Sequence, residues 1–173
     1  MNTTYLILMI LCLSGLMIRT GYELLKEAGR VNPRSKAVFA VVFMGMCLVL
    51  LTWPFLGLHD PIPFHSPGAV HWAGLFVVVT GLGLAVGGVA QLRGLENIDH
   101  LVVGGLFAKL RHPMYTGFIL WILGWIVYHG ATLNVVLGGI AIASILTWRR
   151  IEEQKLEVQF GEDYRRYKKG TWF

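Results

Sequence analysis

Residues 114–148 read MYTGFILWILGWIVYHGATLNVVLGGIAIASILTW, without a single Asp, Glu, Lys or Arg. Two apolar runs, Met114–Tyr128 and Thr132–Trp148, are separated only by His129-Gly130-Ala131. A transmembrane helix needs roughly 20 apolar residues, and a connection of two to five residues can join antiparallel helices. This stretch therefore predicts a helical hairpin, with two short spans, that starts and ends at one membrane surface.

Three further apolar runs precede the hairpin, at Thr4–Ile18, Ala37–Leu58 and Ala69–Ala90. The 173-residue chain is 55% hydrophobic and only 14% charged, which is too apolar for an ordinary soluble domain. We predict an all-α polytopic membrane protein with five transmembrane helices and a cytoplasmic C-terminal helix. Residues 1–173 are expected to form one integral membrane domain, with three spans in residues 1–91 and the hairpin and C-terminal segment in residues 92–173.

The basic residues indicate the orientation, because Lys and Arg that flank a span are retained in the cytoplasm. All fifteen, Arg34 and Arg93 among them, lie between the first and second spans, between the third and fourth, or after the fifth. The N-terminus, the Leu58–Val70 loop and the hairpin tip carry none. We predict an external N-terminus and a cytoplasmic C-terminus. The formal charge of +5 then reflects topology and contact with anionic lipids, not nucleic-acid binding.

Other features have structural interpretations. Gly83 and Gly87, in the third span, have the spacing that lets helix backbones approach closely, which predicts a packing face. The segment Thr20–Val31 mixes apolar and charged residues and predicts an amphipathic helix on the membrane surface. No metal site is predicted, because the candidates in the external loop lack a compact ligand spacing: His59, Asp60, His65 and His71.

The motif Arg111-His112-Pro113-Met114-Tyr115-Thr116-Gly117 lies where the chain re-enters the membrane. Pro113 suits the first position of a helix because it lacks the amide hydrogen that would go unpaired there, which puts His112 at or beside the N-cap. Glu152 and Glu153 follow the hairpin, which returns them to the same surface. Since packed helices lie about 8–10 Å apart, the motif and the two acids can share one pocket. Taken separately, the same residues suit an interfacial anchor, a helix cap and a solvated helix.

Together these segments resemble the isoprenylcysteine carboxyl methyltransferase family and, more distantly, the membrane phospholipid N-methyltransferases. The matching elements occur in family-like order and spacing: Leu101-Val102-Val103-Gly104-Gly105, Arg111 to Gly117, Glu152-Glu153, Leu156, Phe160-Gly161, Tyr164 and Tyr167. The resemblance implies that residues 92–173 form a core that binds S-adenosylmethionine and releases S-adenosylhomocysteine.

By position, the resemblance implies a cofactor site made of Leu101, Val102, His112, Pro113, Met114, Tyr115, Glu152 and Glu153. Gln91 looks like the family's cofactor-contacting glutamine, and His100 is a further candidate. Phe107 stands where the family has a tyrosine, so the ring is kept without its hydroxyl. Trp148 aligns with the family's substrate-contacting arginine, and Arg149 follows it directly.

The resemblance and the residue chemistry predict an S-adenosylmethionine-dependent methyltransferase that acts at the cytoplasmic membrane face on a lipophilic or prenylated substrate. A carboxylate can hold the ammonium group of the cofactor. The favoured reaction is carboxyl O-methylation of an isoprenylcysteine-like compound, with Arg111, assisted by Arg149 or Arg150, orienting the acidic head group. Two alternatives stay open: N- or S-methylation of a phospholipid amine or a small thiol, and a non-catalytic transport or assembly subunit.

Overall fold

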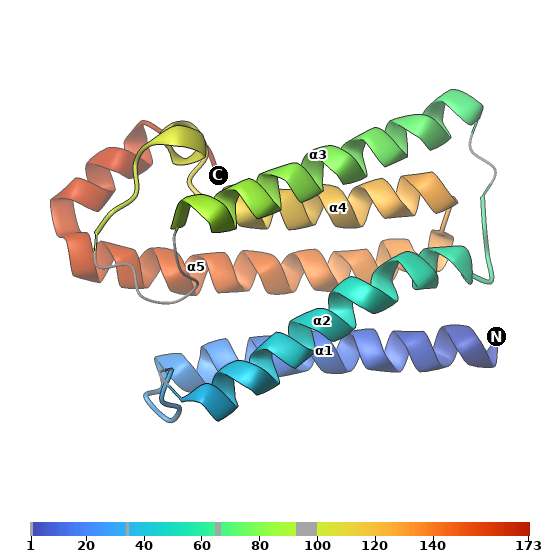
Figure 1. The fold of residues 1–173 in the computed structure, drawn as a ribbon, viewed down its shortest axis with the longest axis horizontal. Coiled ribbons are helices and arrows are strands. Elements are labelled where there is room, and N and C mark those ends of the chain that lie inside the picture. The colour runs from blue at the N-terminus through green and yellow to red at the C-terminus, as the bar shows by residue number, and fades with distance from the viewer. Residues whose placement is uncertain (1, 34, 65–66, 93–99) are drawn as a thin grey trace.

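The structure, a computed structural model, describes residues 2–33, 35–64, 67–92 and 100–173. Within these residues the protein is all-helical and forms no β-strand, as the sequence predicts. Figure 1 shows the elements in order: α1 (Thr3–Glu27), α2 (Lys36–Leu58), α3 (Gly68–Leu92), the 3-10 helix η1 (Gly105–Ala108), α4 (Pro113–His129) and α5 (Thr132–Lys169).

Four of these helices, α1, α2, α3 and α5, are long and apolar enough to cross a membrane. The fifth apolar run forms α4, which has 17 residues. The connection between α4 and α5 is Gly130-Ala131, and the chain reverses direction there, so that the two helices run antiparallel (Figure 1). The protein is therefore a helical membrane protein with several helices capable of spanning the bilayer.

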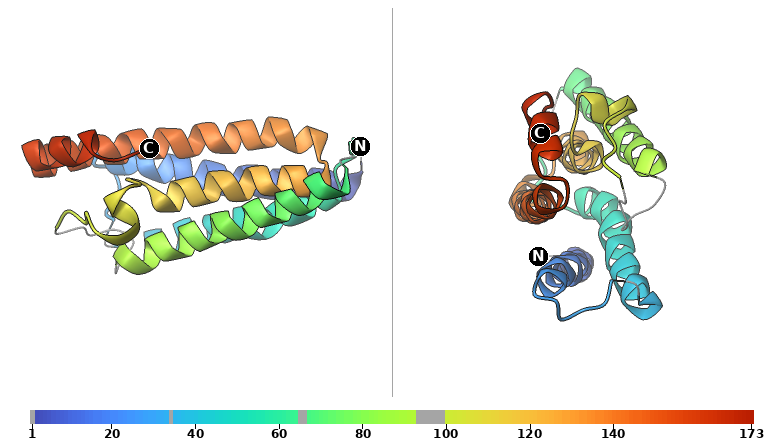
Figure 2. Two further views of the ribbon diagram at one scale, coloured as in Figure 1. Left: turned by 90° about the horizontal axis from the view of Figure 1, so that it is seen from above. Right: turned by 90° about the vertical axis from the view of Figure 1, so that its left-hand side faces the viewer.

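The helices pack as two pairs around α5. In the views of Figure 2, α3 lies along α4, α1 crosses α2, and α5 lies against both α4 and α1. One apolar cluster joins all of these elements except η1; it includes Cys12, Trp53, Val78, Ile122 and Ile145. Because lipid surrounds such a bundle, many large apolar side chains also remain on the outer surface.

A stripe of glycines brings α3 and α4 into backbone contact. A Cβ atom added at Gly74, Gly81 or Gly88 would lie 2.6–3.0 Å from backbone atoms of α4. Gly117 and Gly124 of α4 are equally tight, since a Cβ there would lie 2.5–2.7 Å from backbone nitrogens of α3. Small residues favour such close approach in membranes, where packing replaces hydrophobic burial as the force between helices.

The predicted packing face of this glycine-rich span is confirmed, but Gly74, Gly81 and Gly88 form it, and not the pair Gly83 and Gly87. A Cβ at Gly83 would meet nothing within 4 Å, and one at Gly87 would meet the side chain of Leu106 in η1 rather than α4. The reason is the helical period: residues seven apart, such as Gly74 and Gly81, return to the same face after two turns, whereas Gly83 lies about 200° around the helix from Gly81.

Two helices extend farther than the apolar runs predict. The expected separate helix at Thr20–Val31 is wrong, because α1 continues through this segment to Glu27, and Tyr22 and Glu23 are buried. Likewise, α5 passes Trp148 and continues to Lys169. At Gly161 the backbone takes φ 52° and ψ −123°, a conformation open mainly to glycine, and the chain turns there toward η1 (Figure 1).

Both ends of the bundle contain buried polar groups. At the end that holds the N-terminus, the backbone amides of Ile62 and Asn134 donate to the Asp60 carboxylate at 2.9 and 3.0 Å. The Tyr5 hydroxyl donates to the Asn134 side chain at 3.0 Å. The opposite end collects the last turns of α1 and α3, the start of α2 and α4, and the polar part of α5 (Figure 1). The predicted basic segments lie at this second end; Arg34 and Arg93, as well as the external His65, fall outside the described residues.

Candidate active site

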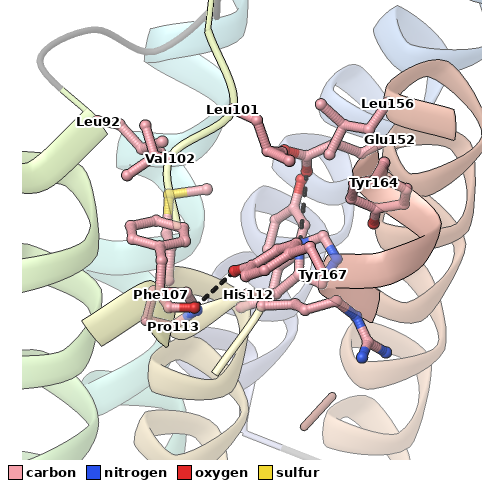
Figure 3. Close-up of a pocket in the computed structure, with 13 residues that line it drawn as sticks. Leu92, Leu101, Val102, Phe107, His112, Pro113, Glu152, Leu156, Tyr164 and Tyr167 are labelled. Atoms are coloured by element: carbon pink, nitrogen blue, oxygen red, sulfur yellow. Dashed lines mark hydrogen bonds and ion pairs between the residues drawn. The ribbon is translucent and has the colours of Figure 1, made fainter. Parts of the chain in front are cut away.

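A pocket lies at the end of the bundle that carries the basic segments, with a volume of about 510 Å³ when the space open to solvent is included; Figure 3 shows its lining. The walls come from the end of α3, the 101–112 segment, the start of α4 and both parts of α5: Leu92, Leu101, Val102, Phe107, Arg111, His112, Pro113, Met114, Tyr115, Glu152, Leu156, Tyr164 and Tyr167.

His112 and Pro113 begin α4 and are positioned by helix geometry. Pro113 occupies the first turn, and His112 is the N-cap, with a side chain that is 5% exposed. The backbone carbonyl of His112 accepts from the amide and hydroxyl of Thr116. As a result the imidazole is directed at α5, with Nε2 at 3.2 Å from Glu153 and Nδ1 at 4.0 Å from Glu152.

Glu153 is the centre of a buried ionic cluster behind the pocket wall. Its carboxylate lies 3.2 Å from His112 Nε2, 2.9 Å from Lys168 Nζ and 3.3 Å from Arg111 Nε. The hydrogen bond with His112 and the one with Lys168 lower the pKa of Glu153 well below its usual range, against an opposing effect of burial. Arg111 Nη1 also donates to the backbone carbonyls of Lys168 and Thr171, at 3.0 and 2.7 Å. We call these five residues, Arg111, His112, Glu153, Lys168 and Thr171, the clamp.

Glu152 faces the pocket, although the adjacent Glu153 belongs to the clamp. Successive helical residues point about 100° apart, so the two acids cannot serve one site from the same direction. The Glu152 side chain is 33% exposed, against 11% for Glu153. In Figure 3 this carboxylate and the ring of His112 face each other.

The turn at Gly161 returns two tyrosines to the pocket. Tyr164 is buried, and its hydroxyl has no hydrogen-bond partner among the described residues. Burial raises the pKa of Tyr164 above its usual range, so its hydroxyl is neutral at physiological pH. The Tyr167 hydroxyl donates to the Phe107 backbone carbonyl at 2.7 Å (Figure 3), which joins α5 to η1.

The final residues of the chain cover the clamp. The Arg111 amide donates to the Trp172 carbonyl at 2.9 Å, and the Trp172 amide donates to the Lys109 carbonyl at 2.8 Å. The ring of Phe173 lies edge-on to His112, with centroids 6.5 Å apart. Together with the Arg111 side chain, these contacts attach the chain after α5 to the segment before α4.

The structure gathers nine of the predicted site residues at the pocket: Leu101, Val102, Phe107, Arg111, His112, Pro113, Met114, Tyr115 and Glu152. It does not bring five others into the pocket lining: Gln91, His100, Arg149, Arg150 and Glu153. Gln91 accepts a hydrogen bond at 3.0 Å from the amide of Leu106 and so holds η1, while His100 and Arg150 are exposed. Arg149 lies over the ring of Phe173, 4.4 Å from its centroid.

Four lining residues, Leu92, Leu156, Tyr164 and Tyr167, were not among the predicted site residues. Leu156 is detectable in principle, since it lies four residues after Glu152 and therefore on the same helix face. Leu92 follows Gln91 at the end of α3. The two tyrosines reach the pocket only because the helix breaks at Gly161, which a straight extrapolation of α5 does not show.

Fold and site together define a small helical membrane protein with an enclosed, aromatic-rich pocket at one end of its bundle. The chain belongs to the NnrU protein family, whose sequence profile matches residues 6–171. The predicted relationship to isoprenylcysteine methyltransferases is confirmed by this match together with the curated relatives.

Three relatives carry the name protein-S-isoprenylcysteine O-methyltransferase. The one from Schizosaccharomyces pombe is 36% identical over 76 residues, which cover 43% of this chain and 32% of that protein. The Dictyostelium discoideum protein is 28% identical over 113 residues (58% and 47%), and the Rattus norvegicus protein is 32% identical over 114 residues (56% and 38%). The matched regions thus span between a third and a half of these relatives. No solved structure gives a significant match.

Proposed function

We propose that this protein is an S-adenosylmethionine-dependent methyltransferase that acts on a lipophilic acceptor at the membrane surface. The observation that carries the proposal is the pocket, in which a part-exposed carboxylate (Glu152) and an unpartnered hydroxyl (Tyr164) face the same enclosed space. The names of the three relatives support the reaction class.

The pocket residues fit the chemical groups of S-adenosylmethionine. Glu152 is an acceptor for an ammonium group, and the Tyr164 hydroxyl can bond to a polar atom of the cofactor. Aromatic rings at Phe107, His112 and Tyr115 offer faces for an adenine ring and for a sulfonium cation. Leu101 and Val102 close the apolar side. When bound, the cofactor supplies an activated methyl group on a positively charged sulfur.

The protein's own contribution is alignment and exclusion of water. Methyl transfer requires the acceptor atom, methyl carbon and sulfur to lie in line, and a site at the membrane edge keeps that arrangement dry. The clamp holds His112 and the chain after α5 in place around the pocket. We assign Arg111 to this positioning role, since its Nε and Nη1 are occupied by Glu153, Lys168 and Thr171.

We further propose that α4 is a fifth span and forms a membrane hairpin with α5. Its 17 residues have a length of about 25 Å, close to the roughly 30 Å of a bilayer core. The positive charges put the pocket and the C-terminus in the cytoplasm and the N-terminus outside. Residues 1–173 then act as one domain, in which 92–173 provide most of the cofactor site.

The favoured acceptor is the carboxylate of an isoprenylcysteine-like compound. A carboxylate is already ionised at neutral pH, so an oxygen lone pair can form the new bond to carbon while the carbon–sulfur bond breaks, and no proton has to be removed. An amine or a thiol would need a base, and the histidine of this site is already held by Glu153 at 3.2 Å. The geometry therefore favours the carboxylate.

The test uses the purified full chain in a neutral detergent. S-adenosylmethionine is titrated by calorimetry, and methyl-labelled cofactor is then incubated with the protein and a membrane lipid extract. We expect saturable binding and a lipid-soluble product that releases labelled methanol in mild base, as a methyl ester does. A base-stable product would indicate N- or S-methylation, binding without transfer would indicate a non-catalytic subunit, and no binding by folded protein would refute the proposal.

A further inference from the structure

A second cavity, of about 820 Å³ when the space open to solvent is included, adjoins the pocket between α1, α4 and α5. The two share Leu92, Met114, Tyr115, Glu152 and Leu156 as a common wall. The rest of the second cavity is lined by charged and polar side chains: Arg19, Glu23, Lys26, Lys155 and Gln159. We call it the charged cavity. Three cations against two carboxylates give its lining an excess of positive charge.

Arg19 of α1 is held rigidly at this cavity. Its guanidinium lies 5.3 Å from the ring centroid of Trp148 and 5.5 Å from that of Tyr22. Glu23, one helical turn later, forms an ion pair with it, and the Arg19 side chain is only 15% exposed. A planar guanidinium that is fixed in this way loses little conformational freedom when it binds a carboxylate or a phosphate.

Lys155 supplies a second cation with spare donors. Its Nζ lies 4.0 Å from Glu23, too far for a hydrogen bond, and is a buried atom without a hydrogen-bond partner in the described part of the chain. An ammonium group has three donors, and leaving them unpaired away from water is unfavourable. An anion in the charged cavity would pair this group.

A small apolar cavity, of about 20 Å³, continues the same seam deeper into the bundle. In each of three helices, a residue of the apolar cavity lies about one turn from a residue of the charged cavity. The pairs are Leu16 with Arg19 in α1, Phe118 with Tyr115 in α4, and Trp148 with Glu152 in α5. The seam is therefore charged near the surface and apolar below. That order matches an amphiphile with its head toward the cytoplasmic surface.

We propose that Arg19 and Lys155 bind the anionic head group of the methyl acceptor, with its hydrocarbon chain directed along the apolar seam below. The assignment rests on the proposed methyltransferase function and adds to it the residues that recognise the negatively charged head of the acceptor, a carboxylate or a phosphate monoester. The shared wall at Tyr115 and Glu152 puts such a head group beside the cofactor pocket.

The experiment compares three probes of similar hydrocarbon chain: N-acetyl-S-geranylcysteine, its neutral carboxamide, and geranyl monophosphate. Binding to the full chain in neutral detergent is measured by calorimetry for the wild type, Arg19→Gln and Lys155→Gln. Arg30→Gln is the matched control, since Arg30 is exposed and follows α1 at the same end of the bundle. Affinity for S-adenosylmethionine is measured on the same samples.

We expect the wild type to bind the carboxylate at least about tenfold more tightly than the carboxamide, as charge-assisted hydrogen bonds require. Arg19→Gln should reduce this preference to less than about threefold, Arg19→Lys should restore part of it, and Arg30→Gln should retain it. The phosphate probe tells which anion is preferred. Equal binding of acid and amide by the wild type, or a preference that survives both Arg19→Gln and Lys155→Gln, overturns the assignment. A wild type that binds no S-adenosylmethionine instead refutes the methyltransferase proposal.

Discussion

The clamp and the pocket lie on two sides of the same turn of α5. The acidic side chain of the clamp is buried and paired, whereas that of the pocket is more exposed. In the clamp, Glu153 is in contact with His112, Lys168 and Arg111, and its side chain is 11% exposed. In the pocket, Glu152 is three times as exposed, and the Tyr164 hydroxyl has no partner among the described residues.

This difference separates stability from binding. Removal of a buried charge leaves its partners uncompensated, so changes in the clamp should unfold this end of the bundle. The Glu152 carboxylate and the Tyr164 hydroxyl contribute little to folding, so changes at these two residues should mainly affect ligands. Substitution of Glu153 is thus expected to lower stability, and substitution of its neighbour Glu152 to lower ligand affinity.

The largest effect is expected for Glu153→Ala, which leaves His112, Lys168 and Arg111 without their shared carboxylate. We expect a loss of about 3–5 kcal/mol in the free energy of unfolding, measured by denaturation in detergent. Glu157→Gln is the control, because Glu157 pairs with the exposed Arg165 and the change should have little effect on stability. Equal losses in the two variants would contradict the clamp.

A change in α3 tests the helix packing without touching either polar region. Gly81→Ala adds a Cβ at 2.6 Å from the Gly117 carbonyl, so α3 and α4 must separate, at an expected cost of about 1–3 kcal/mol. Gly83→Ala, whose Cβ meets nothing within 4 Å, should be stabilising by about 0.5–1 kcal/mol. Thermal unfolding of the two variants should shift in opposite directions; shifts of the same sign would refute the assigned packing face.

Two tyrosine hydroxyl groups can be removed separately, one that holds the fold together and one that faces the pocket. Tyr167→Phe removes the donor to the Phe107 carbonyl and should cost about 0.5–1.5 kcal/mol. Tyr164→Phe removes an unpartnered hydroxyl, so the ligand-free protein should be as stable as the wild type or slightly more stable, while its affinity for S-adenosylmethionine falls. A destabilised Tyr164→Phe protein with unchanged affinity would reverse the two roles.

The smallest effect is a pH dependence of the clamp. The pKa of Glu153 is lowered in the folded protein, so its contribution is complete above the pKa of about 4.3 that a glutamate has in the unfolded chain. As pH falls below that value toward the folded pKa, the contribution is lost. The stability difference between the wild type and Glu153→Gln should therefore shrink as the pH falls below about 4. A difference that grows on acidification would contradict this sign.

The sequence alone was sufficient to predict that His112 and Glu152 meet. Apolar run length and the short Gly130-Ala131 connection bring the start of α4 and the second half of α5 to one end, and the structure puts the two side chains 4.0 Å apart. Run length also predicts where each of the five long helices lies, although α1 and α5 extend beyond their apolar runs to Glu27 and Lys169. These features follow from the local composition of the chain, which needs no knowledge of tertiary contacts.

Features that depend on side-chain direction were less accessible. The different roles of Glu152 and Glu153 depend on the rotation of α5 about its own axis, which a pair of adjacent acids does not reveal. The return of Tyr164 depends on one left-handed glycine, Gly161, inside a polar helix. The cation beside Trp148 comes from Arg19 on α1, a tertiary contact between residues far apart in the sequence.

The most direct test of the central claim is the affinity of Glu152→Gln for S-adenosylmethionine, with thermal stability measured on the same sample. Because Gln keeps the shape but removes the charge, we expect affinity to fall about 10- to 100-fold, as the loss of a charge-assisted hydrogen bond does, with an unfolding midpoint close to that of the wild type. Wild-type affinity in a folded Glu152→Gln protein would contradict the claim that this pocket holds the cofactor's ammonium group.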